Sequence, residues 1–211
     1  TMLTITLQDG SKREAEAGIR IFDFMKQVKN SLTKTVLAAK VDGETKDLTT
    51  VLDKDCRVEF LTFEDADGRW ALRHTASHIL AQAVKRLYKD SNAKLAIGPA
   101  IENGFYYDFD IDRQLGASDL AAIEKEMKRI VKENLKLERK EVSRVEALKF
   151  FEAKGESYKV ELINDLPEDT TISMYTQGEF TDLCAGPHVV STGKVKALKL
   201  QSVAGAYWRG D

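Results

Sequence analysis

The sequence has 211 residues, 43% of them hydrophobic and 31% charged, so it is long enough for one large domain or two small ones. A net charge of −2 gives no overall attraction for nucleic acid, so a nucleic-acid site would have to be a local patch. The two cysteines, Cys56 and Cys184, make no disulfide framework and favour a reducing, cytoplasmic compartment. No apolar run approaches the roughly 18 residues of a membrane span, and the N-terminus lacks the pattern of a signal peptide.

The first sixty residues predict a small α+β domain. Leu3, Ile5 and Leu7 alternate with polar residues as in a half-buried strand, and Asp9-Gly10 is a hairpin turn signal. The expected order of elements is strand, strand, helix, strand, short strands and strand, which is that of a ubiquitin-like β-grasp. We expect a binding or scaffolding module without catalytic residues over 1–63. A polar stretch at 64–69 is the expected linker. The expected elements are strands 3–7 and 15–17, helix 22–28 and strands 36–41 and 56–63.

Residues 70–88 predict a long helix that opens the second domain, 70–211. Apolar residues recur there at offsets of three and four and form one stripe. His74 and His78 are one helical turn apart and nearly opposite this stripe. The two imidazoles therefore either point into water or line a second surface that another segment covers.

The middle of this domain predicts a short strand at 93–99 and a strand at 105–110 with an aromatic face that includes Tyr107. Ser118-Asp119 is an N-cap signal for a helix that runs to about residue 134. A basic row lies nearly opposite its core stripe, and it is either a solvated face or a surface that contacts phosphates. The row consists of Lys125, Arg129, Lys132 and Lys136.

The last third alternates expected strands and one helix. Ser143 and Glu146 form a capping box that opens a helix through Ala153, and Gly155 suits its C-terminal end. Lys159 is expected to be exposed. The fold class is thus α+β, a β-grasp domain followed by a domain with a long helix packed on an antiparallel sheet. Further strands are expected at 135–142, 170–175 and 194–199.

The histidines and one cysteine form two spaced pairs, because Cys184 and His188 are also four residues apart. His74, His78, Cys184 and His188 would supply four ligands for tetrahedral zinc. A second interpretation is metal-free hydrolysis, with imidazoles as bases and Asp182 orienting one of them or accepting from a substrate. A thiolate at Cys184 is also chemically possible, and a third interpretation is that each residue packs separately.

The chain contains, in order, the segments RHTASHILAQAVKRLY, AIGPAIENGFYYDFD, GESYKV, DLCAGPH and SVAGAYWRGD. Considered together, these five segments resemble the editing domain of bacterial threonyl-tRNA synthetases, and residues 1–63 resemble the TGS domain of these enzymes. The resemblance implies hydrolysis of seryl-tRNA(Thr), which arises when serine is accepted in place of threonine. A missing methyl group is worth only about 1–3 kcal/mol, so a second site is needed to reject serine.

The resemblance also implies roles for single residues. His74, His78, Cys184 and His188 match the active-site quartet, Lys159 matches a lysine near the ester and the attacking water, and Asp182 matches an aspartate beside the amine or hydroxyl of the substrate. Gly98 and Tyr107 match positions that line the aminoacyl-adenosine pocket. Ala185 stands where many members have arginine. The implied mechanism is assisted by the substrate ribose and uses no metal.

The whole enzyme of this family attaches threonine to tRNA(Thr) with ATP, and its Mg and Zn belong to a synthetic core that we expect outside this chain. The ending AYWRGD favours a piece of a longer protein. The implied partners are the aminoacylated 3′ end of tRNA(Thr), the rest of the synthetase and a second copy in a homodimer, with no membrane. The alternatives are a non-catalytic tRNA-docking module and an alanyl-type, zinc-dependent editing hydrolase.

Overall fold

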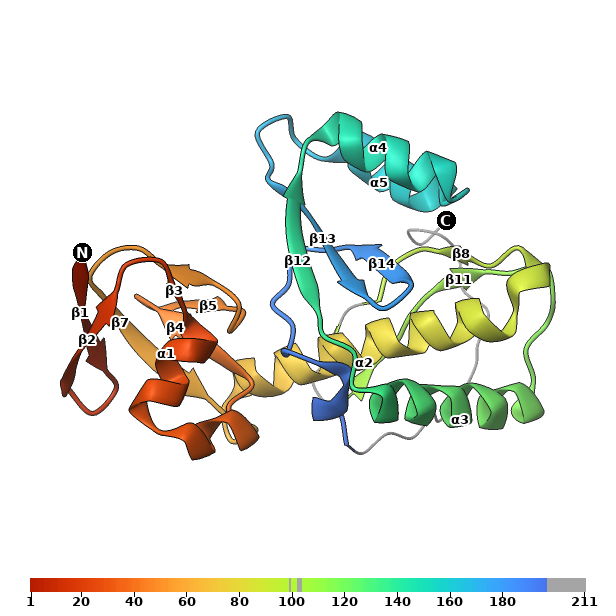
Figure 1. The fold of residues 1–211 in the computed structure, drawn as a ribbon. Coiled ribbons are helices and arrows are strands. Elements are labelled where there is room, and N and C mark those ends of the chain that lie inside the picture. The colour runs from red at the N-terminus through yellow and green to blue at the C-terminus, as the bar shows by residue number, and fades with distance from the viewer. Residues whose placement is uncertain (99, 102–103, 197–211) are drawn as a thin grey trace. The chain divides into compact units, whose positions relative to one another are not determined.

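The computed structural model describes residues 1–98, 100–101 and 104–196 and is drawn in Figure 1. Its internal contacts define two compact units. The first comprises residues 1–74 with 186–190, and the second comprises 75–185 and the residues from 191 onward. Within the described ranges, no helix combines the length and the apolar character that a membrane crossing requires.

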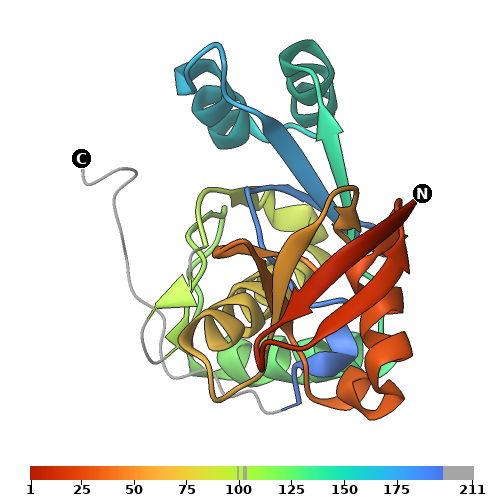
Figure 2. The same cartoon turned by 90° about the vertical axis from the view of Figure 1, so that its left-hand side faces the viewer.

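The first unit contains the predicted β-grasp. Its five-stranded sheet has the order β2-β1-β7-β4-β5, with β1 and β7 parallel and the other neighbours antiparallel. Figure 2 shows β1 and β2 as adjacent antiparallel arrows. Strands β3 (Ile19–Arg20) and β6 (Val51–Leu52) form a separate, short antiparallel pair. The five strands are β1 (Met2–Leu7), β2 (Lys12–Glu16), β4 (Ala38–Val41), β5 (Glu44–Lys46) and β7 (Cys56–Leu61).

The β-grasp core forms because apolar side chains alternate along β1 and recur along one helix. Leu3, Ile5 and Leu7 are buried, whereas the intervening side chains are exposed or half-buried. Helix α1 (Ile21–Val28) contributes Ile21, Phe24 and Met25 to the same cluster. The strand alternation and the helical spacing predicted here are thus confirmed. A 3₁₀ helix, η1 (Asn30–Lys34), follows α1.

Helix α2 (Ala66–Leu87) corrects two predictions. It begins at Ala66, so most of the expected linker at 64–69 is helical. The expected apolar stripe is also too narrow, because the helix is buried almost all round from residue 74 to residue 84. Both histidines are buried, whereas Leu87, an apolar residue at the end of the helix, is 38% exposed. Polar side chains such as Ser77 and Gln82 are buried because they have hydrogen-bond partners.

The second unit contains a three-stranded antiparallel sheet with the order β12-β13-β14. Helices α4 and α5 lie side by side next to this sheet (Figures 1 and 2), and Ala147, Phe151 and Ile163 pack with β13 in one apolar cluster. The bounds are α3 (Ala117–Glu133), α4 (Arg144–Ala153), α5 (Ser157–Asp165), β12 (Glu138–Val142), β13 (Ile172–Gln177) and β14 (Phe180–Leu183).

The aromatic stretch predicted as one strand at 105–110 is broken into two short pairings. Strand β10 (Gly104–Phe105) pairs with β9 (Ala100–Ile101), whereas β11 (Phe109–Asp110) pairs with β8 (Lys94–Leu95). The predicted alternation is confirmed at the centre of the stretch, where Tyr107 is 8% exposed and Tyr106 is 39% exposed, whereas Asp108 and Phe109 are both half-buried.

Local capping signals were only partly correct. The capping of α4 by Ser143 is confirmed, because its Oγ accepts a hydrogen bond from the Glu146 N–H at 3.1 Å. Helix α3 instead has Gly116 at its N-cap, and Asp119 accepts from the Gly116 N–H at 2.8 Å. The expected closing strand at 194–199 is wrong where it is described, because η3 (Thr192–Lys194) is a 3₁₀ turn. Residues 197–199 lie outside the described residues. The other 3₁₀ turn of this unit is η2 (Lys89–Ser91).

Candidate active site

Asp182 lies at the centre of a buried polar cluster in the second unit. Its Oδ1 accepts from the Lys159 ammonium at 2.9 Å, and its Oδ2 accepts from the Tyr107 hydroxyl at 2.6 Å. The Nε2 atom of His78 lies 3.4 Å from the same Oδ2. All four side chains are buried. Because β14, α5, α2 and the segment after β10 each supply one residue, the cluster exists only in the folded chain.

Burial and the neighbouring cations act in opposite directions on the pKa of Asp182. Burial alone would raise it, but Lys159, His78 and the Tyr107 hydroxyl together hold the pKa below its ordinary value. Burial and the nearby carboxylate raise the pKa of Tyr107 well above its usual range. At neutral pH, Asp182 is therefore a carboxylate and Tyr107 a neutral donor to it. The Lys159 ammonium also lies 5.4 Å from the centre of the Tyr107 ring.

The prediction that Lys159 would be exposed is wrong, because the side chain is 3% exposed. The stretch 157–165 is helix α5, and Lys159 and Ile163 lie one turn apart on its buried face. The helical spacing of the apolar residues Val160 and Ile163 was the signal in the sequence that could have placed this lysine on a helix.

His74 and His188 form a second arrangement, within the first unit. Their rings are stacked with centroids 4.1 Å apart, and the Trp70 ring lies 4.7 Å from His74 on the same helix. The backbone N–H of His188 donates to Asp47 Oδ1 at 2.6 Å. Asp47 was not expected to have a role, and nothing in its sequence context distinguishes it from an ordinary turn residue.

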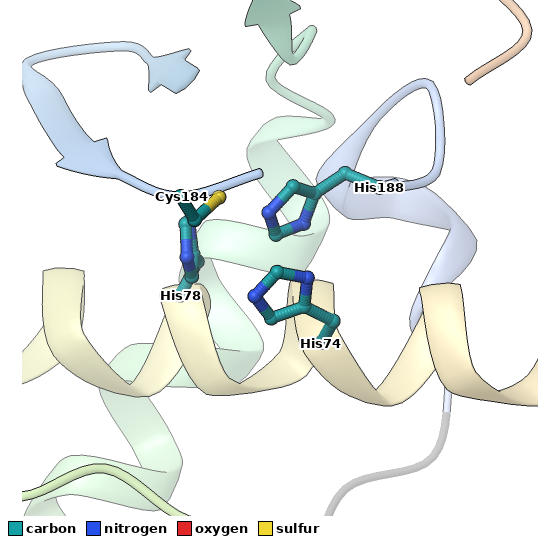
Figure 3. Close-up of side chains that lie close together, drawn as sticks. All are labelled: His74, His78, Cys184 and His188. Atoms are coloured by element: carbon teal, nitrogen blue, oxygen red, sulfur yellow. The ribbon is translucent and has the colours of Figure 1, made fainter. Parts of the chain in front are cut away.

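The two spaced pairs of the sequence meet in the structure. His74 and His78 come from consecutive turns of α2, and Cys184 and His188 come from the segment after β14 (Figure 3). One ligand atom from each of the four lies within 4.8 Å of the others. Three nitrogen donors and one sulfur donor are a ligand set that suits tetrahedral zinc. Among the residues that the structure describes, these four are therefore the group that could hold a metal ion.

Gly98 and Tyr107 lie against each other. The Gly98 carbonyl accepts from the Ser77 hydroxyl at 2.6 Å, which ties this residue to α2. A Cβ atom at position 98 would lie 2.1 Å from the Tyr107 ring, so a larger residue would displace the tyrosine from Asp182. Gly98 thus supports the position of the Tyr107 hydroxyl.

The predicted basic row is not part of this cluster. Lys125, Arg129 and Lys132 are exposed on α3, and Arg129 pairs with Glu126 at 3.1 Å. Lys136 lies beyond the end of α3, so it does not continue the helical row. Ala185, the position where arginine was expected, is exposed.

Comparisons with known proteins agree with the resemblance of the motifs. Residues 3–62 match the TGS domain, and residues 172–211 match the family described as the threonyl and alanyl tRNA synthetase second additional domain. Proteins named threonine--tRNA ligase from Acetivibrio thermocellus and Clostridium botulinum are each 61% identical to this chain over 210 residues. The protein of that name from Clostridium acetobutylicum is 59% identical.

Each match covers 100% of this chain but only 33% of the relative, so the chain spans about a third of the length of these relatives. The two matched domains follow one another in the order that the motifs predicted. The chain therefore contains a TGS domain and a synthetase second additional domain, and it corresponds over its whole length to the N-terminal third of threonine–tRNA ligases.

Proposed function

We propose that this chain hydrolyses the aminoacyl ester of seryl-tRNA(Thr). The observation that carries the proposal is the buried cluster in which Asp182 contacts Lys159, Tyr107 and His78. Burying two opposite charges costs desolvation free energy that burying an apolar pair of similar volume does not cost. A buried ion pair is therefore weak evidence for a stabilising role. It is better explained as a preorganised polar surface for a charged substrate.

The substrate is a compact amino acid bound through an ester to the terminal ribose of tRNA. Serine differs from threonine by one methyl group, worth about 1–3 kcal/mol in a single binding site. A hydrolytic site that admits serine and has no room for the additional methyl group would remove the error. The Gly98 backbone and the Tyr107 ring are suited to such exclusion, because they pack so closely that even a Cβ atom at position 98 would lie 2.1 Å from the ring.

In the proposed reaction, water adds to the ester carbonyl, the bond from that carbon to the ribose oxygen breaks, and the ribose oxygen takes up the proton. Asp182, ionised at neutral pH, accepts from the ammonium or hydroxyl group of serine. Lys159 and His188 hold the attacking water, and the cationic lysine favours the negative charge that develops on the carbonyl oxygen. His74 contacts the ribose.

The proposal does not require a metal. Zinc fits the donor set of His74, His78, Cys184 and His188, and, if three of these residues held it, it would lower the pKa of a water bound as the fourth ligand. Metal analysis of the purified protein, with hydrolysis measured before and after chelation, separates these two forms of the proposal. Stoichiometric zinc whose removal abolishes hydrolysis would replace the metal-free form.

The direct test is to incubate the chain with seryl-tRNA(Thr) and with threonyl-tRNA(Thr) and to follow both esters. We expect rapid loss of the seryl ester, persistence of the threonyl ester and no hydrolysis by the His74→Ala variant. Lys128→Ala is a matched control on the exposed face of α3, with a side chain that is 61% exposed. Equal, slow loss of both esters would overturn the proposal.

A second candidate is a non-catalytic tRNA-docking role, which the exposed cations Lys125, Arg129 and Lys132 favour. If charge reversal at these positions abolished RNA binding while His74→Ala left deacylation unaltered, this candidate would replace the first. In either case we propose that the chain acts within a longer cytoplasmic ligase that attaches threonine to tRNA(Thr) with ATP. The ATP, Mg and Zn of that protein would bind outside this chain, and its assembly would be a homodimer.

A further inference from the structure

We propose that Glu156 is a positioning residue for the editing site, an inference that rests on the function proposed above. Glu156 occupies the N-cap position of α5 and is 4% exposed. It does not contact Asp182 in any hydrogen bond found among the described residues. Its carboxylate instead joins α2 and α5, which supply His78 and Lys159, to β8, which pairs with β11 two residues after Tyr107.

The two oxygens of Glu156 have different partners. Oε1 accepts from the ammonium of Lys85 on α2, and Oε2 accepts from the backbone N–H of Leu95 on β8 at 2.7 Å. Lys85 is also bonded to the carbonyl of Ala93, immediately before β8. The carboxylate is thus the common point of α2, β8 and the beginning of α5.

Each of these elements leads directly to one partner of Asp182. On α5, Lys159 follows Glu156 by three residues, less than one helical turn. On α2, Lys85 follows His78 by seven residues, which places the two on the same face two turns apart. On β8, Leu95 pairs with Phe109, two residues after Tyr107.

The charge of Glu156 is needed for this arrangement. A buried carboxylate is tolerated only when it is paired and hydrogen-bonded, and Glu156 has one cationic and one backbone donor. Alanine at this position would release both donors. Glutamine would retain an acceptor for the Leu95 N–H but lose the ion pair with Lys85. The two substitutions should therefore disturb Lys159, His78 and Tyr107 to graded extents.

The experiment compares Glu156→Ala and Glu156→Gln with Glu126→Gln. Glu126 is a matched control because it is also a buried carboxylate held by cations, Arg86 and Arg129, but it lies on α3, which supplies no partner of Asp182. The first readout is the ¹⁵N–¹H NMR signal of the Lys159 ammonium, assigned with Lys159→Met. Such signals are observed when a buried ion pair slows proton exchange with water.

We expect the Lys159 signal to be lost in Glu156→Ala, weakened in Glu156→Gln and unchanged in Glu126→Gln. The second readout is hydrolysis of seryl-tRNA(Thr). A displacement of about 1 Å can cost up to about 100-fold in rate, so we expect kcat to fall 10- to 100-fold in Glu156→Ala with KM changed less than threefold. Glu126→Gln should lower the thermal midpoint about as much as Glu156→Ala does, but it should keep kcat within twofold of the original value.

An unchanged Lys159 signal in Glu156→Ala, or an equal fall of kcat in Glu126→Gln, would overturn the inference. If Glu156→Ala does not fold, Lys85→Met, which retains the bond between Glu156 and Leu95, serves as the second variant with the same two readouts. If the unaltered chain hydrolyses no seryl-tRNA(Thr), the proposed function fails, and the NMR signal alone still decides whether Glu156 positions Lys159.

Discussion

The β-grasp and the region around Asp182 have different kinds of core. In residues 1–63, all of which the structure describes, one charged side chain is buried, Asp47. The described part of the second unit buries four charged side chains, each with an opposite charge or a hydrogen-bond donor or acceptor as its partner. These are Glu126, Glu156, Lys159 and Asp182.

This difference fits the proposed division between residues that stabilise the fold and residues arranged for hydrolysis. An apolar core gains free energy from every buried methylene group, at about 25 cal/mol per Å² of buried surface. A buried ion pair approximately offsets its own desolvation, so selection for stability alone would not favour it. The exception in the β-grasp supports this view, because Asp47 binds the backbone of His188, a member of the quartet.

The largest expected effect comes from removing one partner of the buried ion pair between Lys159 and Asp182. Lys159→Met leaves the Asp182 carboxylate buried without its closest cation, and we expect a loss of about 3–5 kcal/mol in the free energy of unfolding. Adding Asp182→Leu should recover most of that loss while hydrolysis of seryl-tRNA(Thr) remains abolished. Urea unfolding and deacylation assays on both variants test this, and a double variant as unstable as the single one would contradict the comparison.

Truncation of a side chain in the apolar core should have a comparable effect on stability and no effect on the rate of ester hydrolysis. Phe24 is 1% exposed, so Phe24→Ala should cost about 3–5 kcal/mol. Hydrolysis per folded molecule should stay within twofold of the original rate. The control is Phe63→Ala, since that side chain is 53% exposed and its loss should be nearly neutral. A folded Phe24→Ala protein that no longer hydrolyses the ester would refute the separation.

Asp47→Ala tests the exception in the β-grasp. It deprives the buried N–H of His188 of its acceptor, which should cost about 1–3 kcal/mol. Because the N–H that loses its acceptor belongs to His188, a member of the quartet, we also expect kcat to fall about tenfold. Asp55→Ala is the matched control, since Asp55 binds the Thr4 N–H at 2.8 Å but touches no member of the quartet. Equal kinetic effects in the two variants would show that Asp47 is only structural.

The smallest effect concerns acid stability. Hydrogen bonds from Arg86 and Gln82 lower the pKa of Glu179 from 4.5 to about 2, despite the opposing effect of burial. A lowered pKa stabilises the folded state above the unfolded value, and this stabilisation is lost as the pH falls from about 4.5 towards 2. The difference in urea midpoint between the original chain and Glu179→Gln should therefore be present at pH 6 and vanish near pH 2.

Phe24→Ala provides the reference for that measurement, because its cost involves no titrating group and should persist across the same pH range. A Glu179→Gln difference that stayed constant down to pH 2 would show that the hydrogen bonds of Arg86 contribute no pH-dependent stability.

The sequence by itself determined the elements whose signals are local. Alternation in β1, the apolar spacing of α1 and the Ser143 capping box depend on residues within one strand or turn, so pattern and structure agree. The pairs His74/His78 and Cys184/His188 were also visible, because the two members of each pair are only four positions apart in the sequence. Motif order was sufficient to indicate the family of threonine–tRNA ligases, to which the comparisons then pointed as well.

Only the tertiary structure decided which polar residues are buried. The residue pattern alone predicted Lys159 in water, although the family resemblance placed it near the ester, and Asp47 was given no role. A side chain's burial depends on segments that are distant in sequence. The separation between Lys159 and Asp182 is 23 positions, and that between Tyr107 and Asp182 is 75. No local period records such pairings. They form because folding brings α5, β14 and the aromatic segment together, where an unpaired charge would cost too much.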